Sequence, residues 1–182
     1  MVSSPLHSAE EAGCRPSDTS QRLRGRIADM TDRTRGYAYR IDVTVPAAAV
    51  WAALTTSAAL DQWCSAGAKI DARQGGSLRA NVDRVTEFEA HIDVFSPQRR
   101  MRLIHLPSAL LPATDSTLVD DFVLDASGEA TIVRVLGSGI PTDSAWDAIY
   151  MRRRTGWERA MARLKVHVER EAERNGSRRS AS

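Results

Sequence analysis

The sequence predicts an α+β fold in which a curved antiparallel sheet packs against one long C-terminal helix. An alternating apolar pattern comes first and is followed by two short helical patterns. Six further strand patterns follow with turn signals between them, and a single amphipathic helix closes the domain. Consecutive strands joined by short turns pair antiparallel, and such a sheet buries its apolar face against a helical layer.

The first strand is predicted at residues 37–45. Pro46 ends this strand and suits the first turn of a short helix. A second short helix is expected over residues 57–65, with Thr56 or Ser57 as its N-cap. The apolar side chains of the strand share one face because they alternate, and they are Tyr37, Tyr39, Ile41, Val43 and Val45.

The six further strands are expected where apolar and polar residues alternate between turn signals. Gly75 and Gly76 mark one tight turn, residues 97–100 form a polar turn, and Gly128 lies in another. These turns make a chain of adjacent hairpins, which favours an antiparallel sheet. The strands are predicted at residues 67–73, 77–82, 86–95, 101–106, 118–124 and 131–136.

A long helix is predicted from Ser144 to Glu173. Its inward stripe repeats at intervals of three and four residues, which follows the α-helical period. Gly176 is a stop signal, so we expect residues 174–182 to be a disordered tail. The stripe consists of Trp146, Tyr150, Arg153, Trp157, Met161, Leu164 and Val168.

Residues 1–36 are mostly small, polar or charged and hold no lasting apolar period. We therefore expect a disordered extension there, followed by one domain at residues 37–173. The extension has no secretory apolar core, which predicts a cytoplasmic protein. Met30 lies just before the predicted domain and is an alternative start to Met1.

The composition excludes several classes of protein. Hydrophobic residues make up 42% of the chain, but no run approaches the roughly 18 apolar residues of a membrane helix, so no membrane insertion is expected. The net charge of +2 excludes a strongly charged nucleic-acid binder. Cys14 and Cys64 are isolated, and zinc, nucleotide-binding and serine-hydrolase motifs do not occur in the sequence. We therefore expect no metal or other cofactor.

Five segments, which together span most of the predicted domain, carry a family resemblance. They are Val43–Trp63, Gly75–Gly76, Ser96–Leu103, Gly128–Ile140 and Gly156–Glu169. In this order they resemble the START-like SRPBCC superfamily and, within it, the bacterial homologues of the heat-shock-protein-90 ATPase activator. The resemblance implies a helix-grip (START/Bet v-like) fold, with an apolar cavity between the sheet and the C-terminal helix. Many relatives carry a histidine before the Ser-Gly of the late strand, where this chain has Gly137.

Relatives of this kind bind hydrophobic small molecules or lipids, cyclise or hydrate polyketides, or activate a chaperone ATPase. Because one fold hosts all of these, three hypotheses stay open. The first is a protein that binds a hydrophobic or aromatic small molecule in the cavity. The second is a cyclase- or hydratase-type enzyme acting on a polyketide-like substrate. The third is an interaction module resembling the chaperone ATPase activator, for which the sequence shows no partner motif.

Strand alternation directs His105 and Asp120 inward, and the helical stripe does the same for Arg153. A lone buried charge costs several kcal/mol, so each group needs a partner or access to water. In the enzyme hypothesis His105 is the general acid/base, Asp120 orients it, and Arg153 holds an anionic or enolate oxygen. The alternative is structural: all three lie near element ends, where Asp120 and Arg153 simply pair.

Apolar side chains that share this inward face are the candidate ligand contacts beside Arg153. We expect Trp146 and Tyr150, near the start of the long helix, at the mouth of the cavity. On the outer face of the sheet, Ile104, Ile132 and Leu136 could form a homodimer contact. The candidate ligand contacts are Trp146, Tyr150, Trp157, Phe88, Phe122 and Met101.

Overall fold

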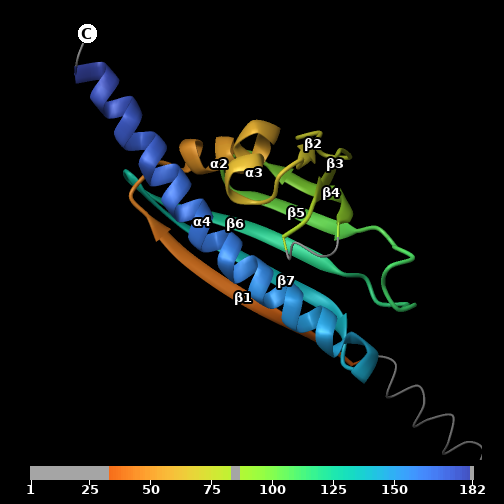
Figure 1. The fold of residues 1–182 in the computed structure, drawn as a ribbon. Helices are drawn as coiled ribbons and strands as arrows, with labels where there is room; N and C mark the ends of the chain where they lie inside the picture. The colour runs from red at the N-terminus through yellow and green to blue at the C-terminus, as the bar shows by residue number, and fades with distance from the viewer. Residues whose placement is uncertain (1–32, 83–86, 181–182) are drawn as a thin grey trace, which may run out of the picture. The chain divides into compact units, whose positions relative to one another are not determined.

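The structure is a computed structural model, and it describes residues 33–82 and 87–180 (Figure 1). The chain divides into Met1–Arg33 and Thr34–Ser182, and the elements described below belong to the second unit. They follow the predicted order, and the predicted α+β helix-grip fold is confirmed. The elements are β1 (Thr34–Val43), α2 (Ala47–Thr55), α3 (Ser57–Trp63), β2 (Lys69–Ile70), β3 (Ser77–Ala80), β4 (Phe88–Ser96), β5 (Arg100–His105), β6 (Val119–Ser127), β7 (Ala130–Pro141), the 3-10 turn η1 (Ser144–Trp146) and α4 (Asp147–Ser180).

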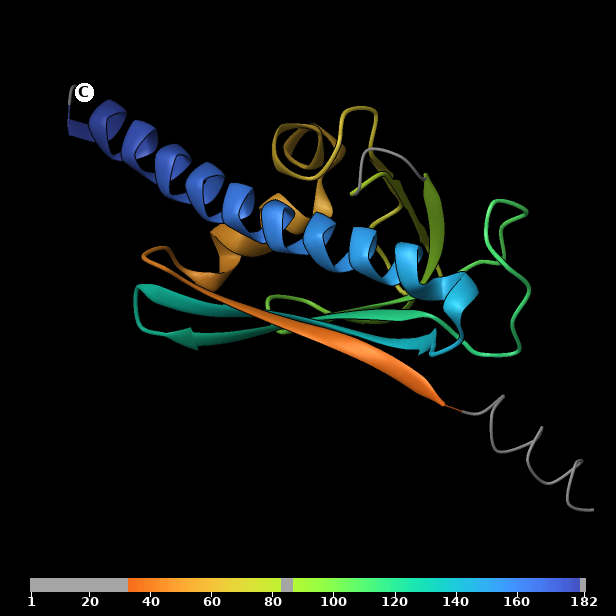
Figure 2. The same cartoon turned by 60° about the horizontal axis from the view of Figure 1, so that its bottom comes forward.

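The seven strands form one antiparallel sheet in the order β1-β7-β6-β5-β4-β3-β2. The first strand therefore closes against the last, with Thr34 opposite Pro141 and Val43 opposite Thr131. Strands β2 to β7 follow each other as hairpins, as the turn signals predict. Figure 2 shows α4 running along one face of the curved sheet, with α2 and α3 on the same side.

The junction between α2 and α3 differs from the prediction that Thr56 or Ser57 caps the second helix. The Thr56 hydroxyl donates instead to the carbonyl of Ala52 at 2.9 Å. The Ser57 hydroxyl accepts from the backbone N–H of Ile70 at 3.2 Å, which ties α3 to β2. Thr56 thus occupies the predicted N-cap position of α3, but no side-chain hydrogen bond caps the helix, because both hydroxyls find partners outside its first turn.

Helix α4 continues through Gly176 to Ser180, past the residue at which the sequence predicts its end. A single glycine inside a helix costs only about 1 kcal/mol relative to alanine, which helix-forming neighbours can offset. At the other end, β1 begins at Thr34, inside the extension predicted over residues 1–36, and residues 1–32 of that extension lie outside the described residues. Among the described helices, none combines the length and apolar character needed to cross a membrane.

The core fills the space between the sheet and the helices. Phe122 of β6 meets Trp157 of α4 edge-on, with ring centroids 5.1 Å apart. The Trp63 indole donates to the carbonyl of Ala53 at 2.9 Å. Cys64 is buried, and burial raises the pKa of its thiol to about 12. The largest fully buried side chains include Trp63, Trp146, Trp157, Phe122, Met101 and Leu103.

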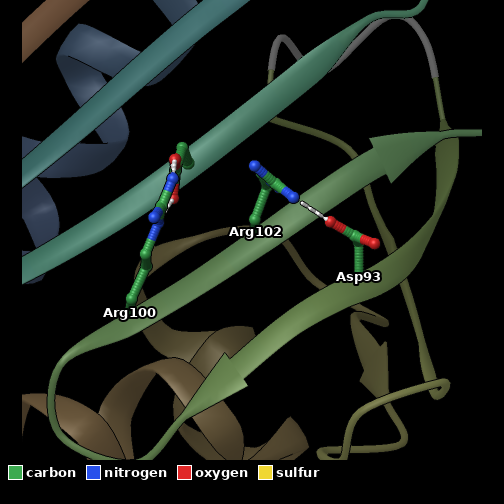
Figure 3. Close-up of polar contacts among 4 residues, drawn as sticks. Asp93, Arg100 and Arg102 are labelled. Atoms are coloured by element: carbon green, nitrogen blue, oxygen red, sulfur yellow. Dashed lines mark hydrogen bonds and ion pairs between the residues drawn. The ribbon is translucent and has the colours of Figure 1, made fainter.

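The outer face of the sheet carries paired charges rather than a continuous apolar surface. Arg102 on β5 donates to Asp93 on β4, and the Arg100 guanidinium lies 2.5 Å from the carboxylate of Asp121 on β6 (Figure 3). Both arginines alternate with buried residues of β5, so they point away from α4. Leu136 is the exposed apolar residue of this face, at 40%.

Candidate functional site

A buried carboxylate, Asp120, lies at the centre of a hydrogen-bond network on the inner face of the sheet. Its Oδ1 accepts from the Tyr37 hydroxyl at 2.5 Å. Its Oδ2 accepts from Arg153 Nη2 at 2.8 Å and from Trp157 Nε1 at 3.0 Å. The same oxygen lies 2.7 Å from His105 Nε2. Strands β1, β5 and β6 and helix α4 thus converge on one carboxylate, which satisfies its need for partners away from water.

Strand register explains how Tyr37 reaches a residue that is 83 positions away. Gly137 of β7 is paired with Tyr37 on one side and with Asp120 on the other. A Cβ atom at Gly137 would lie 2.1 Å from the Tyr37 ring. The glycine therefore leaves the space in which the Tyr37 ring crosses β7 toward the carboxylate. This close approach is a structural reason for the glycine at position 137.

Burial and charge set the protonation states in this network. Burial alone would raise the pKa of Asp120, but Arg153 and His105 outweigh it and hold that pKa well below the ordinary value. Burial lowers the pKa of His105, and the charge of Arg153 lowers it further, whereas the nearby carboxylate of Asp120 raises it by a smaller amount. Burial and Asp120 raise the pKa of Tyr37. At neutral pH the network therefore holds an ionised Asp120 beside Arg153, with neutral His105 and Tyr37.

The contacts of His105 favour one tautomer. Its Nε2 lies 2.7 Å from Asp120 Oδ2 and 2.8 Å from Arg153 Nη2. The Asp120 carboxylate can only accept, so a lone pair on Nε2 would face it at 2.7 Å. We therefore assign the ring proton to Nε2, which donates it to Asp120, while Arg153 Nη2 donates to the same carboxylate oxygen at 2.8 Å rather than to Nε2. The lone pair then lies on Nδ1, which forms no hydrogen bond with any described residue. The Phe88 ring packs against the imidazole, with centroids 4.6 Å apart. His105 is thus a neutral base held in a fixed orientation.

A pocket of about 490 Å³ opens beside His105. The connection between β5 and β6, residues 106–118, forms most of its wall, and Trp146 of η1 completes it. Ser108, Thr114 and Ser116 add hydroxyl groups, but the lining residues, all described, include no aspartate, glutamate, lysine or arginine. This volume lies in the range of small-molecule sites. The apolar part of the lining includes Leu106, Leu111, Pro112, Leu118 and Trp146.

The structure brings most of the predicted site residues together. His105, Asp120, Arg153 and Trp157 share the network. Phe88 lies beside it, with the Arg153 guanidinium 5.5 Å from the centre of its ring. Trp146 shares the pocket lining with His105. These contacts join the buried network to the pocket through one residue, His105.

Of the predicted ligand contacts, Trp146 lines the pocket, and the other six, all of them described residues, do not: Tyr150, Arg153, Trp157, Phe88, Phe122 and Met101. Met101 and Phe122 face each other on β5 and β6, both fully buried in the core. Together with Trp157 they occupy part of the interior in which the resemblance implies a cavity, so the pocket beside His105 lies toward one end of that interior. Tyr150 is half-buried, and its hydroxyl donates to the carbonyl of Gly36 at 3.2 Å.

Sequence reasoning missed two parts of the site. Tyr37 lies on the predicted inner face, but its role depends on its pairing with Gly137 of β7, and no local sequence signal marks that pairing. The wall at residues 106–118 has no periodic pattern, and its leucines and prolines alone did not mark it. Within residues 33–82 and 87–180, no group of three or more His, Cys, Asp or Glu side chains is placed to hold a metal ion.

Comparisons with known proteins agree with this architecture. Residues 44–169 match the family model described as Activator of Hsp90 ATPase homolog 1-like protein. No curated protein matches the sequence significantly.

Among solved structures, protein MLL2253 from Mesorhizobium loti is 18% identical with a TM-score of 0.64, covering 75% of this chain and 98% of its own. The Aha1 dimer from Colwellia psychrerythraea is 17% identical with a TM-score of 0.60, covering 74% and 96%. DynU16, a protein of the dynemicin biosynthetic locus, is 21% identical with a TM-score of 0.57, covering 74% and 47%. At these identities the likeness shows a shared fold.

Proposed function

Because the chain belongs to the Activator of Hsp90 ATPase homolog 1-like family, whose fold supports several unrelated activities, we propose its function from the site itself. We propose that the protein binds a hydrophobic or aromatic small molecule in the pocket beside His105. The observation that carries this proposal is an apolar pocket of about 490 Å³ with a fixed, neutral histidine in its wall.

The lining supports binding by apolar burial. Each Å² of apolar surface removed from water contributes about 25 cal/mol, before the losses of translational and rotational freedom. The Trp146 side chain is 1% exposed, so its ring is already held in place by the core. The His105 ring is likewise fixed by its contacts with Asp120 and Phe88. A wall built from immobilised side chains favours affinity because little ordering is needed when the ligand enters.

A second candidate function is an acid–base enzyme of the cyclase or hydratase type, acting on a polyketide-like substrate. The observation that favours it is the 2.7 Å contact between Asp120 and His105, because a carboxylate that fixes the tautomer of a histidine prepares its other nitrogen to take a proton. Arg153 contacts both residues and helps to hold Asp120 ionised, which keeps the histidine in this tautomer. DynU16, described as a protein of a biosynthetic locus, gives this candidate support from a structural neighbour.

Native mass spectrometry of freshly purified protein tests the binding proposal. We expect a co-purified small molecule on the wild type, and its loss from Ser116→Phe, because Ser116 lines the pocket and the added ring would occupy it. The matched control is Ser138→Phe, the same substitution on an exposed residue of β7. Equal occupancy in both variants would contradict the proposed site.

The fate of the bound molecule separates the two candidates. A binding protein should release the molecule unchanged after hours of incubation. An enzyme should convert it, and His105→Ala should abolish the conversion while circular dichroism shows a folded chain. Conversion that survives in His105→Ala would exclude His105 as the acid/base.

The outer face of the sheet suggests a homodimer, in keeping with the dimeric Aha1 structure among the neighbours. Leu136 is exposed there, and Ile104 and Ile132 are half-buried. Light scattering at micromolar concentration should report a dimer for the wild type and a monomer for Leu136→Asp. The same face would be the one to test for the third hypothesis, chaperone ATPase activation, which the family description suggests.

A further inference from the structure

We infer that the molecule held beside His105 is uncharged and donates a hydroxyl hydrogen bond to His105 Nδ1, a phenol being the simplest such class. This inference rests on the proposed function, and it adds the polarity and hydrogen-bonding character of the ligand. It follows from two independent features: the described residues of the pocket lining include no Asp, Glu, Lys or Arg, and the hydrogen bond from His105 Nε2 to Asp120 leaves Nδ1 of this lining residue without a described partner.

The lining disfavours a charged ligand. Its apolar part is formed by leucine, proline, alanine and tryptophan side chains, and its polar part by Ser108, Thr114, Ser116 and His105. The nearest buried cation of the network, Arg153, is already engaged with Asp120 at 2.8 Å and does not line the pocket. A carboxylate, phosphate or ammonium group would therefore lose its hydration without gaining an opposite charge.

The buried network decides what His105 offers to a ligand. Asp120 accepts hydrogen bonds from Tyr37, Arg153 and Trp157, and its 2.7 Å contact with Nε2 retains the imidazole proton on that side. Nδ1 is then an acceptor with no donor among the described residues. An unpartnered acceptor in a largely apolar pocket favours a ligand with an O–H group, because leaving it unpaired on binding costs free energy. A ligand that could only accept a hydrogen bond would meet the lone pair of Nδ1.

Three aromatic probes of the same ring size separate these properties. They are 2-naphthol, which has the hydroxyl, 2-methoxynaphthalene, which lacks the donor, and 2-naphthoate, which carries a charge. We expect 2-naphthol to bind roughly tenfold more tightly than 2-methoxynaphthalene, as one additional hydrogen bond of ordinary net strength allows. We expect 2-naphthoate to bind more weakly than both. Titrations at pH 7 followed by tryptophan fluorescence give the three dissociation constants.

Two variants show whether His105 is the acceptor. In His105→Ala the advantage of 2-naphthol over 2-methoxynaphthalene should disappear, although both should still bind. In Ser116→Phe all three probes should bind more weakly, whereas Ser138→Phe should leave every affinity unchanged. Imidazole ¹⁵N spectra of wild-type protein add a direct readout, because the chain has four histidines and His105→Ala identifies the relevant signal. The Nδ1 signal should move on adding 2-naphthol and stay in place with 2-methoxynaphthalene.

The outcomes distinguish the inference from the function on which it rests. Equal affinities of 2-naphthol and 2-methoxynaphthalene would overturn the hydroxyl donor and leave the apolar binding site in place. Tightest binding of 2-naphthoate would overturn the uncharged ligand. Failure of all three to bind, or equal binding in Ser116→Phe and wild type, would overturn the binding function at this pocket and the inference with it.

Discussion

Replacing Asp120 with asparagine keeps the size of the side chain and removes the charge on which the buried network depends. The carboxylate is fully buried and lies 2.8 Å from the Arg153 guanidinium, whose side chain is 8% exposed. Removing one member of such a pair typically costs about 3–5 kcal/mol, because the remaining charge stays in a medium that solvates it poorly. This is a large share of the roughly 5–15 kcal/mol that stabilises a typical domain.

Urea denaturation at pH 7, followed by tryptophan fluorescence, measures this loss. If the free energy of unfolding falls by about 2 kcal/mol per M urea, the midpoint of unfolding of Asp120→Asn should lie about 2 M below that of the wild type. The matched control is Asp42→Asn, which breaks a solvent-exposed pair with Arg40 at 2.8 Å and should leave the midpoint nearly unchanged. The double variant Asp120→Asn with Arg153→Met should recover part of the loss, because the second change removes the stranded charge. Equal midpoints for Asp120→Asn and Asp42→Asn would refute the network.

Three further predictions concern neighbouring parts of the fold. Gly137→Ala should lower the free energy of unfolding, measured in urea, by about 1–3 kcal/mol, because its Cβ would lie 2.1 Å from the Tyr37 ring. A loss below about 0.5 kcal/mol would contradict the passage of the Tyr37 ring over residue 137. Stability should fall as the pH drops below 6.5, the ordinary pKa of histidine, because His105 takes up a proton more readily in the unfolded chain than in the folded one. It should fall again above pH 10.0, the ordinary pKa of tyrosine, because Tyr37 loses its proton more readily in the unfolded chain. Thermal melts over this range should show a lower melting temperature at both ends. In a Cys14→Ser background, Cys64 should stay unreactive toward a thiol reagent at pH 8 until urea is added, since burial raises its pKa to about 12.

The sequence pattern was sufficient to predict that these polar residues face inward. The period of two in a strand places His105 on the face of Met101 and Leu103, and places Asp120 on the face of Phe122. The structure buries all of these side chains, and the strand order that the turns predict is also observed. Local patterns suffice here because each strand must direct its apolar residues toward the same core.

The contacts between the site residues could not be predicted from these local patterns. The bond from Tyr37 to Asp120 depends on the pairing of β1 with β7, which joins the two ends of the domain and has no local signal. The pocket wall at residues 106–118 lacks a period, so its position depends on where β5 and β6 end. The stop expected at Gly176 is outweighed by the rest of α4, because one glycine costs less than the helix gains from its neighbours.

The central claim is that the pocket beside His105 binds an apolar molecule, and a chemical-shift titration tests it most directly. Uniformly ¹⁵N-labelled protein is titrated with 2-naphthol, and the perturbed amides and indoles are assigned to the chain. The proposed site predicts shifts that saturate and gather at residues 105–118 and at the Trp146 indole. Shifts that gather instead around Leu136 on the outer face of the sheet, or no saturable shifts, would contradict it.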